Sequence, residues 1–178
     1  MSCPDSSTRD AWLRLPDEAL LAQCDQVRFR ASGPGGQRRN KVETGVRLLH
    51  RPSGVGAQAA ESRSTETNRA VALRRLRLRI ALETRVAFDL MARRLPGELA
   101  AQRGGDGSLS VNPRNPAYAL IVASALDALS AAQGSYALAA SALGLTTSQL
   151  RRFLEADREI WRAIQEGGIP SPSGRGLG

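Results

Sequence analysis

A segment rich in glycine, proline, asparagine and serine, residues 96–116, divides this chain of 178 residues into two parts of different composition. Strand-like and strongly basic sequence precedes the segment, and alanine- and leucine-rich sequence follows it. Such stretches usually connect domains instead of packing inside them. The sequence therefore predicts a domain over 15–95, a linker over 96–116 and a second domain over 117–166, with a mobile N-terminus over 1–14 and a flexible tail over 167–178.

The pattern of the first part predicts a small α+β domain. Pro16, Asp17 and Glu18 are typical of the first turn of a helix, and the turn residues Arg51–Gly54 separate two apolar runs as in a hairpin. The order of elements is typical of a small antiparallel sheet with a long helix packed on it. In chain order we expect a helix from Leu15 to Cys24, strands over Val27–Ala31, Gly45–His50 and Val55–Ala60, and a long helix over Ser64–Leu95.

The second part is predicted to be an all-α module of three helices, over Tyr118–Ala132, Ser135–Leu143 and Thr147–Gln165. Its last two helices resemble a helix-turn-helix, with Gly144 in the turn. The side chains that such a motif would present to a partner are Thr147, Gln149, Arg151 and Arg152. Residues 117–166 hold 4 basic and 5 acidic residues, a net charge of −1 that counts against DNA binding. Docking on RNA, on a protein or on another factor, and plain helix packing, stay open.

Basic charge is concentrated in the first part of the chain. The net charge of the whole chain is +8, but Arg28–Arg94 holds 16 basic and 5 acidic residues, a net of +11. Charge that is spread evenly can serve solubility alone, whereas this concentration is typical of a surface that binds a polyanion.

The supply of cysteine and histidine excludes several classes of protein. With Cys3, Cys24 and His50 alone, the chain cannot build a disulfide scaffold, a zinc site of four such ligands, or a reaction that uses two histidines. We expect no metal, no cofactor, and a structural role for His50. No apolar run approaches the roughly 18 residues of a membrane helix, and the first residues lack a basic-then-apolar signal pattern, so we expect a cytoplasmic protein without membrane contact.

A glycine-rich loop, SGPGGQRRN at Ser32–Asn40, follows the first predicted strand. It fits neither the GxGxxG nor the GxxxxGK[ST] nucleotide-binding pattern. Gly35 and Gly36 have no β-carbon, so the main chain before Gln37 can approach a ligand very closely.

With this loop the sequence resembles a known family. The stretches RASGPGGQRRNKVETGVRLLHRPSGV and SRSTETNRAVALRRLRLRI resemble the catalytic domain of class I peptide chain release factors and of short ribosome-rescue peptidyl-tRNA hydrolases. The similarity covers roughly Leu15–Leu90. It departs from the family pattern at Arg38, where a histidine is frequent.

The resemblance implies hydrolysis of the ester between a nascent peptide and its tRNA on the ribosome. The catalytic residues would be Gly35, Gly36 and Gln37, with the backbone N–H of Gln37 stabilising the oxyanion. RNA binding would fall to Arg38, Arg39, Asn40, Lys41, Arg63, Arg69, Arg74 and Arg75. The expected partners are the ribosome and peptidyl-tRNA, bound by a monomer.

We expect this reaction to be independent of a codon, because no candidate for a codon-reading tripeptide is evident. The tail that some rescue relatives insert into the mRNA channel is rich in lysine and arginine. In residues 167–178 the only basic residue is Arg175. The alternative is a non-enzymatic nucleic-acid-binding regulator that acts through the helix-turn-helix-like module.

Overall fold

The computed structural model describes residues 6–30, 43–91, 97–102 and 109–166. The chain divides into two compact units, residues 11–83 and residues 84–178 together with 1–10. The division lies at residue 83, and not within the linker that the composition predicts over 96–116. Each unit is described by itself below.

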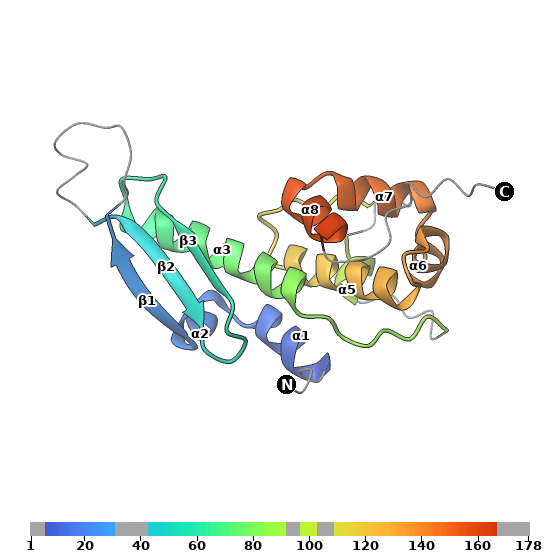
Figure 1. The fold of residues 1–178 in the computed structure, drawn as a ribbon, viewed down its shortest axis with the longest axis horizontal. Coiled ribbons are helices and arrows are strands. Elements are labelled where there is room, and N and C mark those ends of the chain that lie inside the picture. The colour runs from blue at the N-terminus through green and yellow to red at the C-terminus, as the bar shows by residue number, and fades with distance from the viewer. Residues whose placement is uncertain (1–5, 31–42, 92–96, 103–108, 167–178) are drawn as a thin grey trace. The chain divides into compact units, whose positions relative to one another are not determined.

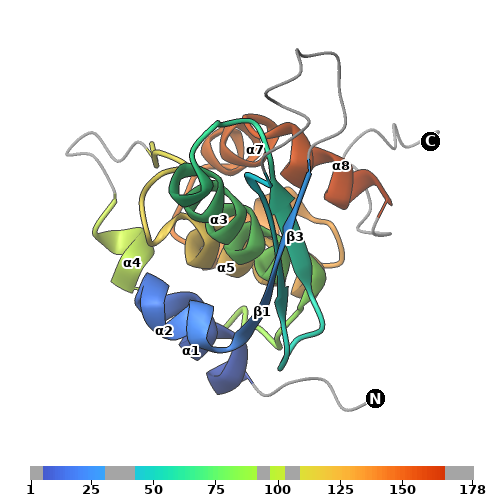
Figure 2. The ribbon, with the colours of Figure 1, turned by 90° about the vertical axis from the view of Figure 1, so that its left-hand side faces the viewer.

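A three-stranded antiparallel sheet forms one layer of the unit 11–83. Its strands are β1 (Cys24–Phe29), β2 (Gly45–His50) and β3 (Gly56–Ala59), in the order β1-β2-β3. Helix α3 (Thr65–Glu83) packs on one face of the sheet, which Figure 2 shows nearly edge-on. The core between the two layers is formed by Val46, Leu48, Ala57, Ala59, Leu73, Leu76 and Ile80. The predicted α+β fold is confirmed.

The hairpin of β2 and β3 follows from local sequence. Buried and exposed residues alternate along β2, as expected for a strand with one covered face. Gly54 has a φ of +70°, which glycine adopts without strain. Its N–H donates to the carbonyl of His50 at 2.8 Å, and that of His50 donates to the carbonyl of Val55 at 2.8 Å. The predicted strand Gly45–His50 and its turn are therefore confirmed.

The N-terminal residues differ from the sequence prediction. Helix α1 (Ser6–Arg14) occupies most of the segment 1–14 that was predicted to be mobile, and α2 (Asp17–Ala22) follows it (Figure 1). Arg9 is 1% exposed and forms an ion pair of 2.7 Å with Asp127. The sequence prediction missed α1 because the partner of Arg9 is more than a hundred residues away.

The long helix α3 ends twelve residues before the predicted end at Leu95, for a similar reason. Beyond Glu83, side chains take over backbone groups that a longer helix would use. Arg9 donates to the carbonyl of Thr84 at 3.0 Å, and the N–H of Val86 donates to Asp127 at 3.1 Å. Thr84 therefore begins an irregular stretch.

The other unit contains α5 (Tyr118–Ala131), α6 (Tyr136–Ala142), α7 (Thr147–Glu155) and α8 (Arg158–Glu166). The third predicted helix, Thr147–Gln165, is in fact two helices. Asp157 lies at the break, where its Oδ1 accepts the N–H of Glu159 at 2.9 Å and its Oδ2 accepts the hydroxyl of Tyr118 at 3.2 Å. The module predicted to have three helices thus has four.

Helix α5 is buried along nearly its whole length and forms the centre of this unit. A short helix, α4 (Gly97–Ala100), lies within the predicted linker and buries Leu99. Among the described residues, no helix combines the length and apolar character needed to cross a membrane.

Candidate functional site

The glycine-rich segment joins the ends of one β-hairpin. β1 ends at Phe29 and β2 begins at Gly45, and these two residues form the last pair of the antiparallel ladder. The structure thus defines the two points at which the segment meets the sheet. The predicted residues within the segment lie outside the described residues; they are Gly35, Gly36, Gln37, Arg38, Arg39, Asn40 and Lys41.

The last pair of this hairpin requires glycine on one strand. A β-carbon at position 45 would lie 2.8 Å from Cζ of Phe29 and 2.8 Å from its carbonyl oxygen, which is closer than real contacts allow. The guanidinium of Arg47 lies 5.6 Å from the centre of the Phe29 ring, a cation–π distance. At this end of the hairpin, the ring of Phe29 therefore packs directly against the backbone of Gly45.

Asn68, in the first turns of α3, ties three backbone groups together. Its Nδ2 donates to the carbonyl of Thr44 at 2.7 Å and to that of Ser62 at 2.9 Å, and its Oδ1 accepts the N–H of Ser62 at 2.9 Å. The side chain is fully buried. The predicted site residues do not include Asn68, although it lies in the stretch SRSTETNRAVALRRLRLRI that carries the family resemblance.

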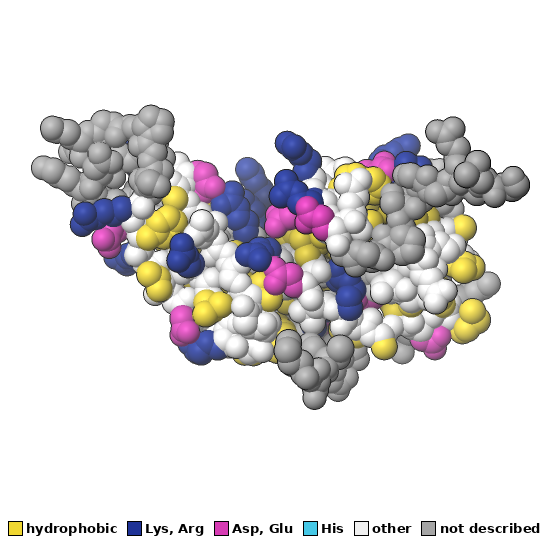
Figure 3. All heavy atoms as spheres, in the orientation of Figure 1, with side chains coloured by type: hydrophobic (Ala, Val, Ile, Leu, Met, Phe, Trp, Pro, Cys, Tyr) yellow, Lys and Arg dark blue, Asp and Glu magenta, His cyan; other side chains and the backbone are white. Residues whose placement is uncertain are grey.

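Three of the predicted RNA-binding arginines are exposed and have no partner among the described residues. Arg63, Arg69 and Arg74 have no ion pair or hydrogen bond within the part of the chain that the structure describes. Their guanidinium groups are therefore available to phosphate oxygens, for which arginine offers a two-pronged set of donors. Figure 3 shows basic side chains interspersed with acidic ones on the face that it draws, so the charge does not form one unbroken patch.

The other arginines of α3 are engaged within the protein. Arg75, also predicted to bind RNA, forms an ion pair of 2.7 Å with Glu61. Arg77 is buried and donates to the carbonyls of Leu13 and Leu15 at 2.8 and 2.6 Å. Arg79 pairs with Glu83 one turn further along the helix. Arg77, which is not among the predicted RNA-binding residues, thus holds the N-terminal segment to α3.

His50 has the structural role expected from the sequence. It is fully buried, with Nδ1 2.7 Å from Oγ of Ser53 and Nε2 3.0 Å from Oε1 of Gln23. Burial lowers the pKa of His50, and the positive charge of Arg51 lowers it further. Nowhere in the described ranges do three His, Cys, Asp or Glu side chains gather as they would around a metal ion.

Helices α6 and α7 form the predicted helix-turn-helix-like pair. Gly144 in the turn has a φ of +62°, and the N–H of Leu145 donates to the carbonyl of Ala140 at 2.8 Å. Thr146 caps α7: its hydroxyl accepts the N–H of Gln149 at 3.2 Å, and Oε1 of Gln149 accepts the N–H of Thr146 at 2.9 Å. The side chain of Gln149 thus serves the helix cap.

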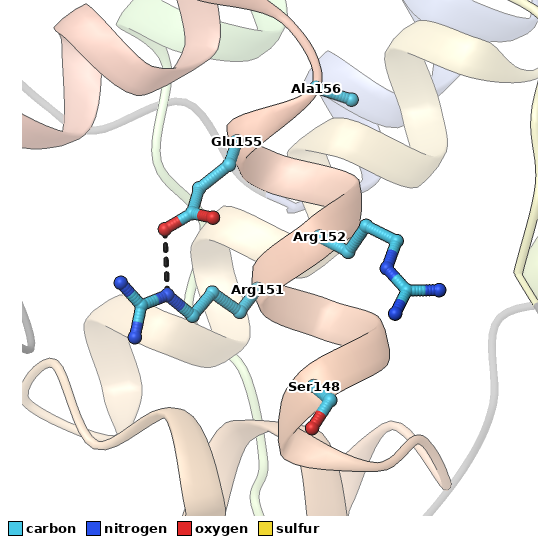
Figure 4. A pocket seen from close by; sticks show the side chains of 5 residues that line it. All are labelled: Ser148, Arg151, Arg152, Glu155 and Ala156. Atoms are coloured by element: carbon cyan, nitrogen blue, oxygen red, sulfur yellow. Dashed lines mark hydrogen bonds and ion pairs between the residues drawn. The ribbon is translucent and has the colours of Figure 1, made fainter.

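The remaining predicted contacts of this module do not converge. Figure 4 shows Arg151 and Arg152 on opposite sides of α7, with Arg151 pointing toward Glu155. The Arg151–Glu155 ion pair measures 2.6 Å, whereas Arg152 has no partner among the described residues. These side chains, with Ser148 and Ala156, line an open hollow of about 420 Å³. Thr147 is exposed beside them.

Comparison with known proteins gives matches to one family. Residues 22–103 match the RF-1 domain. Peptide chain release factor 1 of Acidiphilium cryptum is 49% identical over 59 residues, which cover 33% of this chain and 17% of that protein. Peptide chain release factor 1 of Dictyoglomus thermophilum is 40% identical over 75 residues, which cover 42% and 18%. For peptide chain release factor 2 of Variovorax paradoxus the identity is 52% over 52 residues, covering 29% and 14%.

The chain therefore corresponds to less than a fifth of the length of each of these relatives. No solved structure gives a significant match. The RF-1 match contains β1, β2, β3, α3 and the glycine-rich segment between β1 and β2. Residues 22–103, a little under half of the chain, thus match the RF-1 domain, and over this part the chain is similar to peptide chain release factors.

Proposed function

We propose that this chain hydrolyses the ester bond of peptidyl-tRNA on the ribosome without reading a codon. The observation that carries the proposal is the RF-1 match over residues 22–103, which includes Gly35-Gly36-Gln37. The matched relatives are named as peptide chain release factors. The ribosome and peptidyl-tRNA are the proposed partners, and the proposed active form is a monomer in the cytoplasm.

In the proposed reaction, water attacks the carbonyl carbon of the ester. A new C–O bond forms, the bond to the tRNA 3′ oxygen breaks, and a proton passes to that oxygen. The backbone N–H of Gln37 donates to the developing oxyanion, while Gly35 and Gly36 let the main chain come close enough to do so. The Gln37 side chain shapes the pocket so that water enters and bulkier nucleophiles do not. Ribosomal RNA supplies the rest of the site.

The basic side chains of the RF-1 domain bind phosphates of ribosomal RNA and tRNA in this proposal. Arg63, Arg69 and Arg74 support this role, since they are exposed and unpaired among the described residues. Arg75 contributes less, because Glu61 already neutralises it. The residues Arg38, Arg39, Asn40 and Lys41 are assigned the same role from sequence.

The helical module 117–166 lies outside the RF-1 match. We propose that this module selects the target ribosome by docking on it, and that the module does not bind DNA. The ion pair that Arg151 makes with Glu155 and the net charge of −1 both argue against a phosphate-binding face there.

The test is peptide release from ribosomes that carry peptidyl-tRNA. Gln37→Pro removes the proposed N–H donor, and we expect the rate to fall at least 10²–10³-fold, the usual cost of losing one oxyanion donor. Gln37→Ala keeps that N–H, and we expect it to let a small competing nucleophile such as hydroxylamine react. Gln26→Ala, an exposed glutamine of β1, is the matched control and should behave as wild type. Wild-type rates in Gln37→Pro would overturn the proposal.

A further inference from the structure

Thr44 is the first residue beyond the sheet on the return side of the glycine-rich segment. The ladder between β1 and β2 ends at the pair Phe29–Gly45, so Thr44 has no partner in β1. Its carbonyl instead accepts a hydrogen bond of 2.7 Å from Nδ2 of Asn68. A side chain of α3 thus takes the place of the next strand partner.

The Asn68 amide is fitted to this position. Both N–H bonds of Nδ2 are used, on Thr44 and Ser62, and Oδ1 accepts the N–H of Ser62. An aspartate of the same size can accept but cannot donate to two carbonyls. Because the group is fully buried, no water can replace a lost donor without a change in packing.

The other described side-chain contact close to Thr44 is weaker than that of Asn68. Arg30 and Glu43 form an ion pair of 3.3 Å, with side chains 64% and 50% exposed. Exposed ion pairs contribute little to stability. Asn68 is therefore the buried contact that fixes the backbone at Thr44.

We infer that Asn68 is a positioning residue for the release reaction: it fixes where the segment carrying Gly35-Gly36-Gln37 returns to the sheet. The inference rests on the proposed function. Thr44 lies seven residues after Gln37 in the sequence and directly before Gly45, the first residue of β2 in the ladder with β1. Displacements of about 1 Å at a reacting group can cost about 10²-fold in rate, so a shift at Thr44 is expected to reduce catalysis more than binding.

The experiment compares Asn68→Asp and Asn68→Ala with Arg77→Gln. Arg77 lies on the same helix and also makes buried bonds to carbonyls, but to those of Leu13 and Leu15. Single-turnover peptide release is measured over a range of protein concentrations, at a fixed interval below the Tm of each variant. We expect both Asn68 variants to lose at least tenfold in the rate at saturation, with the half-saturating concentration changed less than twofold. Arg77→Gln is expected to stay within twofold of wild type in both.

Hydrogen exchange at Thr44, Gly45 and Val46 separates this inference from the proposed function. We expect exchange there to quicken at least tenfold in the Asn68 variants and to stay unchanged in Arg77→Gln. If wild type releases peptide but the Asn68 variants match it, or if release merely follows Tm in all variants, the inference is wrong and the function stands. If wild type releases no peptide, the proposed function fails, and exchange still shows whether Asn68 anchors Thr44. Unfolding of both Asn68 variants would contradict a positioning role.

Discussion

In the unit 11–83, Arg63, Arg69 and Arg74 extend from the surface without a partner among the described residues. In the helical unit, Arg9 is buried against Asp127 and Arg151 is paired with Glu155. The same residue type therefore has two uses in one chain. Where acidic partners are near, arginine serves the fold; where they are absent, its charge is left for an external anion.

This difference teaches that a count of basic residues does not locate a binding surface. The segment Arg28–Arg94 has a net charge of +11, yet Arg75, Arg77 and Arg79 within it all bind to groups of the protein itself. Exposure and the lack of a described partner are useful measures only together with the charge of the surroundings: Arg152, Arg158 and Arg162 are also exposed without a described partner, but residues 117–166 have a net charge of −1. Four predictions can break or sharpen the contrast between the two units.

The largest expected effect is on the stability of the helical unit. Asp127 is 3% exposed, and Asp127→Ala removes the buried counter-charge of Arg9 and leaves it the ion pair with the more exposed Asp10. Removing one partner of a buried ion pair costs about 3–5 kcal/mol. Glu155→Ala breaks the more exposed pair with Arg151 and should cost at most about 1 kcal/mol. Chemical unfolding measures both, and equal costs would remove the distinction between a structural and a surface arginine.

The next effect is on ribosome binding by the unit 11–83. Replacing Arg63, Arg69 and Arg74 together by glutamine should weaken binding about 100-fold at 0.1 M salt. The slope of log affinity against log salt should fall by about 2–3, since each phosphate contact contributes 0.7–0.9. The stability of the fold should barely change, because these side chains have no described partner.

The matched control replaces three exposed arginines of the helical unit for which the described ranges contain no partner, Arg152, Arg158 and Arg162. We expect a loss of affinity below threefold. A loss as large as that in the unit 11–83 would show that the helical unit also binds phosphates, and the contrast would fail.

A smaller effect is expected at the cap of α7. Thr146→Ala removes the hydroxyl that accepts the N–H of Gln149, at a cost of about 1 kcal/mol. Thr147→Ala removes an exposed hydroxyl one residue later and should cost less than half of that. Thermal unfolding that shows the same cost for both variants would mean that the capping box adds nothing to this unit.

The last effect concerns the dependence of the stability of the unit 11–83 on pH. Folding lowers the pKa of His50 below its ordinary value of 6.5, so the unfolded chain binds more protons as the pH falls through 6.5. Stability should therefore decrease from pH 7.5 to 5.5, by at most about 1.4 kcal/mol per pH unit. His50→Gln should remove this part of the decrease and leave the curve above pH 7.5 parallel to that of wild type. Identical slopes in both proteins from pH 7.5 to 5.5 would contradict it.

The sequence predicted those parts of the fold that depend on neighbouring residues. β2 and its turn follow from alternation and from Gly54, and the start of α3 follows from the cap at Ser64, whose hydroxyl accepts the N–H of Thr67 at 3.2 Å. The errors occur where a distant side chain decides. Asp127 helps to end α3 early, and Asp157 divides the last predicted helix through its bonds to Tyr118 and Glu159.

The candidate site shows the same division. The motif around Gln37 was evident from sequence because it is contiguous and has a fixed order. The sequence did not reveal the difference between Arg74 and Arg75. Arg75 binds Glu61, whereas Arg74 has no described partner, and this depends on which acidic side chain lies nearby in the folded chain. Asn68 lies in the stretch that carries the family resemblance, but its contact with Thr44 was not evident, since the two residues meet only when α3 packs on the sheet.

The most direct test of the central claim is peptide release by the wild-type chain from ribosomes with peptidyl-tRNA and three kinds of A site: empty, stop codon and sense codon. If hydrolysis is independent of the codon, peptide should be released with all three A sites, and the release rates should differ only as far as access to the A site differs. Gln37→Pro should lose release with each of them. Release that occurs only with a stop codon would contradict codon independence. No release above the Gln37→Pro level with any A site would contradict hydrolysis itself.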